Sequence, residues 1–287
     1  MRKIEYTSSA DHSSQAAMFY ASGSKTPRPL LVALHTWSFD YTQPHSIPYA
    51  AWCIEKDWVF VHPNFRGPNN NPSATGSDLV VADILGAVEY AKANAAVSQV
   101  YLIGESGGGY AALLMAGRAP EVWAGVSAWV PVIDLSAWFQ EASAMKLPYS
   151  DDIARSCGGA PTPGSPAEAE CRRRSATTYL EKARGVPVDL NAGIHDGRDV
   201  DNPIPIRHSL HAFNLLADPA DQLSDETIET MTRTASVPDA LRFSGTDALY
   251  GDKRVLLRRQ SGNARITLFD GEHEAIVRAG LTWLSLL

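Results

Sequence analysis

The chain has 287 residues, of which 45% are hydrophobic and 20% are charged, a composition typical of a globular protein with one large domain or two small ones. Its net charge of −7 argues against nucleic acid or an anionic membrane surface as the main partner. No apolar run approaches the ~18 residues of a membrane span, and no apolar core follows the basic start Met1–Lys3, so neither a membrane segment nor a signal peptide is predicted. A soluble protein is expected, either cytoplasmic or secreted after loss of its leader.

Short apolar runs bounded by turn residues predict strands along the whole chain. In order they are Ile4–Thr7, Gln15–Tyr20, Pro29–His35, Trp58–His62, the apolar start of Val100–Ala116, Trp123–Val130, Val186–Ile194, Arg254–Leu257 and Ala264–Phe269. Helices are predicted over Ala50–Lys56, Asp78–Asn94, the remainder of Val100–Ala116, Pro205–Leu216 and Ala275–Leu286. This alternation favours an α/β fold with a mostly parallel, doubly wound sheet and helices on both faces.

Residues 135–184 depart from this pattern, because they are helical only in pieces and contain the Gly/Pro-rich segment Gly158–Pro166. We interpret them as a cap or lid insertion within a single domain of residues 1–287. The basic run Arg172–Arg174 within them is interpreted as a solvated helix face.

Three cysteines do not make a disulfide scaffold. Cys53 lies in an apolar stretch typical of a buried side chain. Cys157 and Cys171 flank the Gly/Pro-rich segment, and both a disulfide-closed loop and two free thiols fit this spacing.

The sequence Gly104-Glu105-Ser106-Gly107-Gly108 matches the G-x-S-x-G nucleophile elbow. An apolar run precedes it and a helix-forming run follows it, which is the context that this motif requires. Small neighbours let the helix start pack against the strand while the serine projects from the turn. Ser106 is therefore the predicted nucleophile, and the alternative is a glycine-rich turn whose serine only caps the helix.

A serine nucleophile needs a base, and the base needs an acid to orient it. In α/β-hydrolases the acid and then the histidine follow the serine along the chain. His273 lies directly after the last predicted strand, where a catalytic histidine is expected, whereas His208 and His211 fall within a predicted helix and are interpreted as surface or packing residues.

Asp196 follows the end of a predicted strand and is the favoured acid, because a strand end holds a side chain more rigidly than a loop does. Asp199 and Asp201 are its rivals, with turn formation before Pro203 as their alternative role. The same acidic residues lack the full pattern of a calcium loop, so no metal site is predicted.

An oxyanion hole needs two N–H donors, one from the residue after the nucleophile and one from the loop after an early strand. Gly107 and Trp37 occupy these places, with Thr36 as the alternative to Trp37.

Four segments together resemble the α/β-hydrolases and, within them, the catalytic domain of the prolyl oligopeptidase type. They are N-F-R-G-P-N (Asn64–Asn69), G-E-S-G-G-G-Y (Gly104–Tyr110), G-I-H-D with P-I-P-I-R-H-S (Gly193–Asp196 and Pro203–Ser209) and F-D-G-E-H-E (Phe269–Glu274). The resemblance covers nearly the whole chain except Leu135–Arg184 and implies Ser106, Asp196 and His273 as nucleophile, acid and base.

Two features depart from the family pattern. The family's Asp-x-x-Val-Pro spacing is stretched here, which keeps Asp199 and Asp201 as rivals to Asp196. The family's peptidases also carry a large N-terminal propeller, for which this sequence of 287 residues has no room.

These observations predict a serine esterase that acts through an acyl-enzyme and requires no cofactor. Aromatic residues at the mouth would suit small-molecule or carbohydrate esters, such as acetyl or feruloyl groups; they are Trp37, Tyr41, Trp129, Trp138 and Phe139.

Two other functions are weighed against the esterase. The first is a small exopeptidase or aminoacyl-peptide hydrolase, which would anchor an amine on Glu105, Glu141 or Asp134. The second, a non-catalytic binding protein, is disfavoured by the ordered Ser, Asp and His. The sequence leaves the oligomeric state open.

Overall fold

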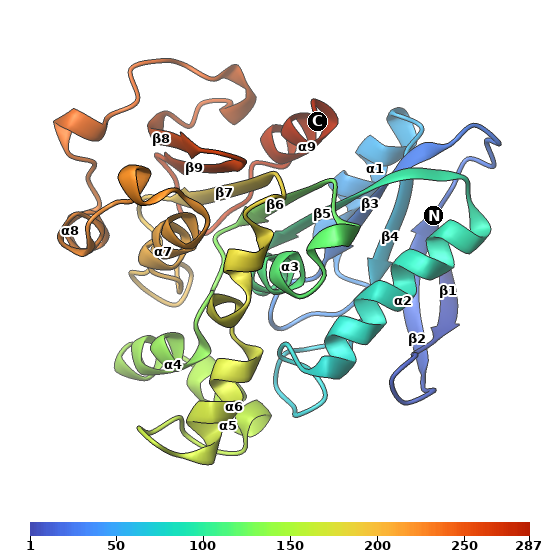
Figure 1. Cartoon of the computed structure of the whole chain (residues 1–287), viewed down its shortest axis with the longest axis horizontal. Helices are drawn as coiled ribbons and strands as arrows, with labels where there is room; N and C mark the ends of the chain where they lie inside the picture. Colours follow the sequence, from blue (N-terminus) through green and yellow to red (C-terminus); the bar gives the residue numbers. More distant parts are fainter.

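The computed structural model describes all 287 residues and is built around one nine-stranded sheet (Figure 1). The strands are β1 (Arg2–Thr7), β2 (Ser14–Tyr20), β3 (Arg28–Leu34), β4 (Val59–Pro63), β5 (Val97–Glu105), β6 (Gly125–Trp129), β7 (Val188–Gly193), β8 (Val255–Ser261) and β9 (Ala264–Phe269). Their order across the sheet is β1-β2-β4-β3-β5-β6-β7-β9-β8. All pairs from β4 to β9 are parallel, while β1, β2 and β8 pair antiparallel at the two edges.

Helices cover both faces of this sheet (Figure 1). They are α1 (Ile47–Glu55), α2 (Asp78–Asn94), α3 (Gly107–Arg118), α4 (Leu135–Ala144), α5 (Tyr149–Cys157), α6 (Pro166–Arg174), α7 (Arg207–Leu216), α8 (Asp225–Thr234) and α9 (Val277–Ser285). Short 3-10 helices occur at Pro44–Ser46, Pro120–Val122, Ala176–Thr178, Leu180–Ala183, Pro219–Asp221, Asp239–Leu241 and Ala248–Tyr250. Helices α1 and α9 pack together on one face, and α2, α3 and α7 pack on the other. The predicted α/β class is therefore confirmed.

The central strands are apolar because helices bury them on both sides. Residues Leu30–Leu34 of β3, for example, are at most 4% exposed. The buried hydrophobic side chains form a single cluster that extends across the sheet, so one core supports the whole chain. None of the helices is long and apolar enough to cross a membrane.

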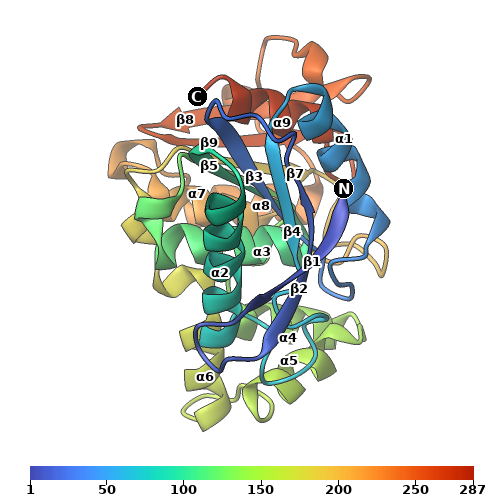
Figure 2. The same cartoon turned by 90° about the vertical axis from the view of Figure 1, so that its right-hand side faces the viewer.

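Helices α4, α5 and α6 gather together at one end of the molecule (Figures 1 and 2). We call α4–α6, with the two 3-10 helices that follow, the cap. The interpretation of Arg172–Arg174 as a wholly solvated face is wrong for Arg174, whose side chain is 5% exposed. Its guanidinium donates hydrogen bonds to the carbonyls of Pro72, Ala74 and Thr75, which ties the cap to the loop before α2.

All three cysteines are buried free thiols, so the structure has the free-thiol arrangement of Cys157 and Cys171. Helix α8 has no counterpart among the predicted elements. Its sequence is mostly polar and its only two apolar residues, Ile228 and Met231, are buried, so it offers too few apolar residues to reveal a helix by pattern.

Candidate active site

Ser106 lies in the turn between β5 and α3 with φ +57° and ψ −120°, a conformation that is strained for a residue with a Cβ. The turn is so tight that a Cβ on Gly104 would lie 2.1 Å from the carbonyl oxygen of Gly108. A Cβ on Gly108 would lie 2.4 Å from the carbonyl oxygen of Leu34 in β3. The glycines are therefore required by close backbone packing, as the elbow motif implies.

The structure brings Asp196 and His273 together from the loops after β7 and β9. Asp196 Oδ2 lies 2.7 Å from His273 Nδ1. The other carboxylate oxygen accepts hydrogen bonds from the backbone N–H groups of Gly197 and Ile204. Asp196 is 2% exposed, so its carboxylate is held by three hydrogen bonds in a nearly dry position and can orient the imidazole.

Ser106 and His273 are not joined by a hydrogen bond in this structure. The contact with Asp196 uses Nδ1 of His273, so Nε2 is not engaged by Asp196. Both Ser106 and His273 are partly exposed. Contacts between nucleophile and base are often long in a free enzyme and tighten when substrate binds.

The rivals of Asp196 have other contacts. Asp199 Oδ1 accepts hydrogen bonds from the N–H groups of Asp201 and Asn202 and from the side-chain amide of Asn202. Both Asp199 and Asp201 are exposed. These contacts are those of a turn, which is the alternative role that the sequence offers for the two aspartates.

Asn202 contacts the candidate site, although no sequence pattern points to it. Its side-chain oxygen accepts a hydrogen bond from the backbone N–H of His273, 3.0 Å away. Its carbonyl oxygen accepts from the N–H groups of Gly197, Arg198 and Asp199. Asn202 therefore links the loop that carries Asp196 to the loop that carries His273.

The backbone of Trp37 packs directly against Gly107. A Cβ on Gly107 would lie 2.5 Å from the amide nitrogen of Trp37. Gly107 opens α3, where the first amides of a helix have no acceptor within the helix. The amides of Gly107 and Trp37 are therefore the candidate donors to an oxygen that becomes negatively charged.

The Trp37 amide is oriented through its two neighbouring peptide groups. The carbonyl of Thr36 belongs to the same peptide as this amide and lies 2.9 Å from His35 Nδ1, while the carbonyl of Asn64 lies 2.8 Å from Nε2 of the same ring. The carbonyl of Trp37 accepts from the backbone and side-chain amides of Asn69. His35 is fully buried and stacks on Phe65 with ring centroids 3.7 Å apart, and burial lowers its pKa.

The side chain of Glu105, the residue before Ser106, makes no hydrogen bond or ion pair. Burial raises the pKa of its carboxyl, and the nearby His273 and His45 oppose this shift. The other two carboxylates considered as amine anchors are already engaged. Glu141 pairs with Arg207 and His208, and Asp134 caps the N-terminus of α4.

The aromatic residues predicted at the mouth divide into two groups. Trp37, Trp129 and Trp138 are at most 3% exposed, so their place is in the interior rather than at the mouth. Tyr41 and Phe139 remain partly exposed. Trp129 is a core residue because its indole N–H donates to Ser127 and its ring packs against Tyr250 and Phe269, both of them buried.

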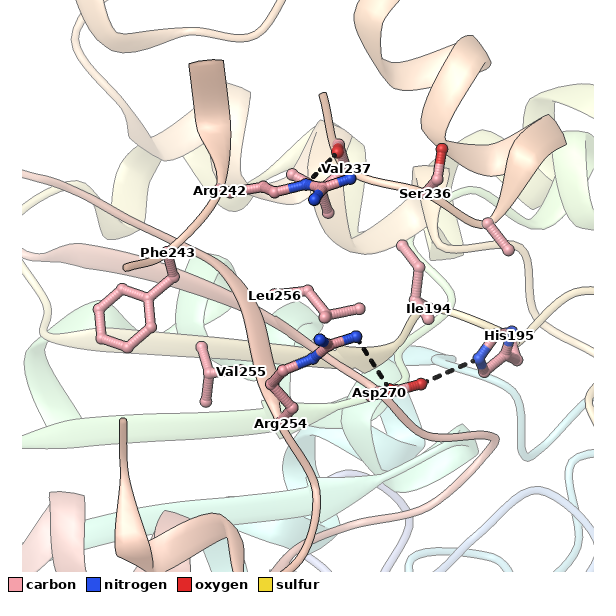
Figure 3. Close-up of a pocket in the computed structure, with 11 residues that line it drawn as sticks. Ile194, His195, Ser236, Val237, Arg242, Phe243, Arg254, Val255, Leu256 and Asp270 are labelled. Atoms are coloured by element: carbon pink, nitrogen blue, oxygen red, sulfur yellow. Dashed lines mark hydrogen bonds and ion pairs between the residues drawn. The ribbon is translucent and has the colours of Figure 1, made fainter. Parts of the chain in front are cut away.

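A cavity of about 290 Å³ is lined by His195, Arg254 and Asp270 among others, but by neither Asp196 nor His273 (Figure 3). Asp270 lies between His195 and Arg254, with its carboxylate 3.1 Å from the first and 3.5 Å from the second. His195 and Arg254 thus each pair with Asp270. No group of three metal-ligating side chains occurs in the chain.

A model of the prolyl oligopeptidase family (peptidase family S9) matches residues 46–232 of the sequence. The match includes Ser106 and Asp196 and ends before His273. No curated protein matches the sequence significantly.

Solved structures resemble the chain at low sequence identity. The acylaminoacyl peptidase of Pyrococcus horikoshii has a TM-score of 0.57 and 16% identity over 75% of this chain and 34% of its own. A structure from a study of two prolyl endopeptidases has a TM-score of 0.55 and 16% identity over 74% of this chain and 32% of its own. An esterase of Pyrococcus furiosus has a TM-score of 0.59 and 12% identity over 99% of this chain and 89% of its own. This chain thus spans about a third of the length of the peptidases and nearly all of the esterase.

Proposed function

The chain belongs to the prolyl oligopeptidase family of serine hydrolases, and we propose that it cleaves carboxylic esters through an acyl-enzyme. The observation that carries this proposal is the set of four loops that hold the strained Ser106 turn, the two members of the bonded pair Asp196 and His273, and the Trp37 amide beside Gly107. Each loop follows the carboxyl end of a parallel strand, and ligands bind at these carboxyl ends in open α/β sheets.

In the proposed mechanism, His273 Nε2 takes the proton of the Ser106 hydroxyl as Oγ attacks the carbonyl carbon of the ester. The N–H groups of Trp37 and Gly107 hold the oxyanion. Asp196 accepts the hydrogen bond from His273 Nδ1, which fixes the tautomer and stabilises the imidazolium. His273 then gives its proton to the leaving alcohol, and water releases the acyl group by the same steps in reverse.

Two observations favour an ester over a peptide substrate. The esterase of Pyrococcus furiosus is similar over nearly the whole of both chains, whereas the peptidases are similar over about a third of theirs. Of the three carboxylates that would anchor a free amine, Glu141 and Asp134 are already engaged.

Acetyl or feruloyl esters of carbohydrates are the substrate class that we propose. Sugar rings stack on exposed aromatic faces. Phe39, which is 51% exposed, and Tyr41 offer such faces in the loop that begins with Trp37.

Hydrolysis of p-nitrophenyl acetate and of an aminoacyl p-nitroanilide by the wild type and by Ser106→Ala tests this proposal. We expect ester turnover in the wild type, its loss in Ser106→Ala, and negligible anilide turnover. A panel of acetylated and feruloylated sugars then defines the alcohol. If the folded wild type neither turns over the ester nor reacts with a fluorophosphonate, the chain is not a serine hydrolase and the proposal fails.

The alternative is a small exopeptidase or aminoacyl-peptide hydrolase with the same catalytic residues. Glu105 favours it, because it is a partly buried carboxylate beside the nucleophile with no partner of its own. Anilide turnover comparable to ester turnover, lost in Glu105→Gln but not in Arg207→Ala, would place this function first.

A further inference from the structure

The cap contacts the loop after β3, which carries Trp37, through a single polar side chain. Asp152 of α5 accepts a hydrogen bond from the indole N–H of Trp37, with Oδ2 and Nε1 3.1 Å apart. The Asp152 side chain is 14% exposed and also pairs with Arg155, one turn further along the helix. The two residues of the hydrogen bond are 115 positions apart in the chain, so only the placement of the cap brings them together.

Aromatic packing holds the same indole from its other sides. The Trp37 ring meets Trp138 of α4 edge to face at 4.7 Å and Tyr149 of α5 at 6.4 Å. Trp138 and Tyr149 stack on each other at 5.0 Å. The indole N–H of Trp138 also faces the carbonyl of Pro203, in the loop that follows Asp196.

The indole and the amide of Trp37 belong to one residue, so fixing the ring restricts the backbone that carries the oxyanion donor. Asn69 holds the carbonyl on the other side of the residue. A donor that is displaced by a fraction of an ångström loses much of its effect on the transition state, whereas substrate binding is little changed.

We propose that Asp152 is a positioning residue, which holds the backbone N–H of Trp37 in the oxyanion hole through the Trp37 indole. The cap is thereby coupled to the rate of the chemical step. This inference rests on the proposed serine hydrolase function.

Four variants test the inference with p-nitrophenyl acetate. In Asp152→Ala and in Trp37→Phe, which keeps an aromatic ring but loses the N–H, we expect kcat to fall about tenfold with KM within about twofold of the wild type. Asp152→Asn keeps an acceptor oxygen and should retain kcat within about threefold. Arg155→Ala removes only the exposed ion-pair partner and should match the wild type.

Asp151→Ala is the matched control, since Asp151 is an exposed carboxylate one residue away on the same helix. The double variant Asp152→Ala/Trp37→Phe should be no slower than either single variant, because both remove the same hydrogen bond. Unchanged kcat in folded Asp152→Ala, a loss shared by Asp151→Ala, or effects that multiply in the double variant would each overturn the inference.

Fluorophosphonate labelling separates this result from a failure of the proposed function. Ser106 in Asp152→Ala should still be labelled, more slowly than in the wild type. If the wild type is neither labelled nor active, the serine hydrolase function fails and the inference fails with it.

Discussion

The backbone strain at Ser106 predicts that this residue destabilises the fold. A residue with a Cβ in the conformation φ +57°, ψ −120° costs about 1–3 kcal/mol relative to a relaxed one, and glycine escapes this cost. Glycine also gains about 0.4–1 kcal/mol of conformational freedom in the unfolded chain, which opposes the gain. Ser106→Gly should therefore be more stable than Ser106→Ala by about 1 kcal/mol.

The comparison of these two variants isolates the Cβ, because both lack the hydroxyl and neither can form an acyl-enzyme. For a domain of this size, the expected difference corresponds to about 2 °C in Tm. Urea unfolding monitored by tryptophan fluorescence measures the free energy of unfolding of both. If Ser106→Gly is equal to or less stable than Ser106→Ala, the turn is not strained and this reasoning is refuted.

Three further predictions concern the acid, the buried histidine and the thiols. Asp196→Asn should lower kcat about 10⁴-fold by presenting the wrong hydrogen-bond partner to His273, while Asp199→Ala should stay within about tenfold of the wild type; the reverse order in steady-state kinetics would make Asp199 the acid. Full burial lowers the pKa of His62 to about 4, so between the unfolded value of 6.5 and that value the unfolded chain binds one more proton. The free energy of unfolding should therefore fall as pH is lowered through this window, by at most about 1.4 kcal/mol per pH unit. The variant His62→Asn can still donate to the carbonyl of Ala33 and should show a shallower dependence of this free energy on pH, measured by urea titrations at pH 7, 6 and 5. A thiol assay in denaturant without reductant should find three free cysteines per chain, and a count of one would mean that two of them are joined.

The sequence predicts the parts of the site whose geometry is set locally. The elbow around Ser106 depends on a strand, a turn and a helix that are adjacent in the chain, and its glycines are required within four residues. His273 and Asp196 each follow a strand that the apolar pattern reveals. The mostly parallel sheet follows from the alternation of strands and helices, which is why the fold class could be predicted.

Features that depend on the folding of loops could not be predicted. Asp196, Asp199 and Asp201 have the same chemistry within six residues, and only the turn around Asn202 separates a buried carboxylate from two exposed ones. Asn202 itself lies before a proline, which indicates a turn. No feature of the neighbouring sequence indicates its contact with His273, 71 residues later. Trp129 and Trp138 illustrate the same limit, because an apolar pattern does not distinguish a tryptophan at a mouth from one in the core.

The groups that position the proposed catalytic atoms come from segments far from those atoms in the sequence. Three of the orienting contacts join segments that are distant in the chain: Asn69 with Trp37, Asn202 with His273, and Asp152 with Trp37. These residues are not required to form the sheet, and two of them lie in loops. Their loss should therefore weaken the geometry of the transition state more than the stability of the fold. A change in the cap or in a loop thus has a route to the reaction rate that leaves Ser106, Asp196 and His273 themselves unaltered.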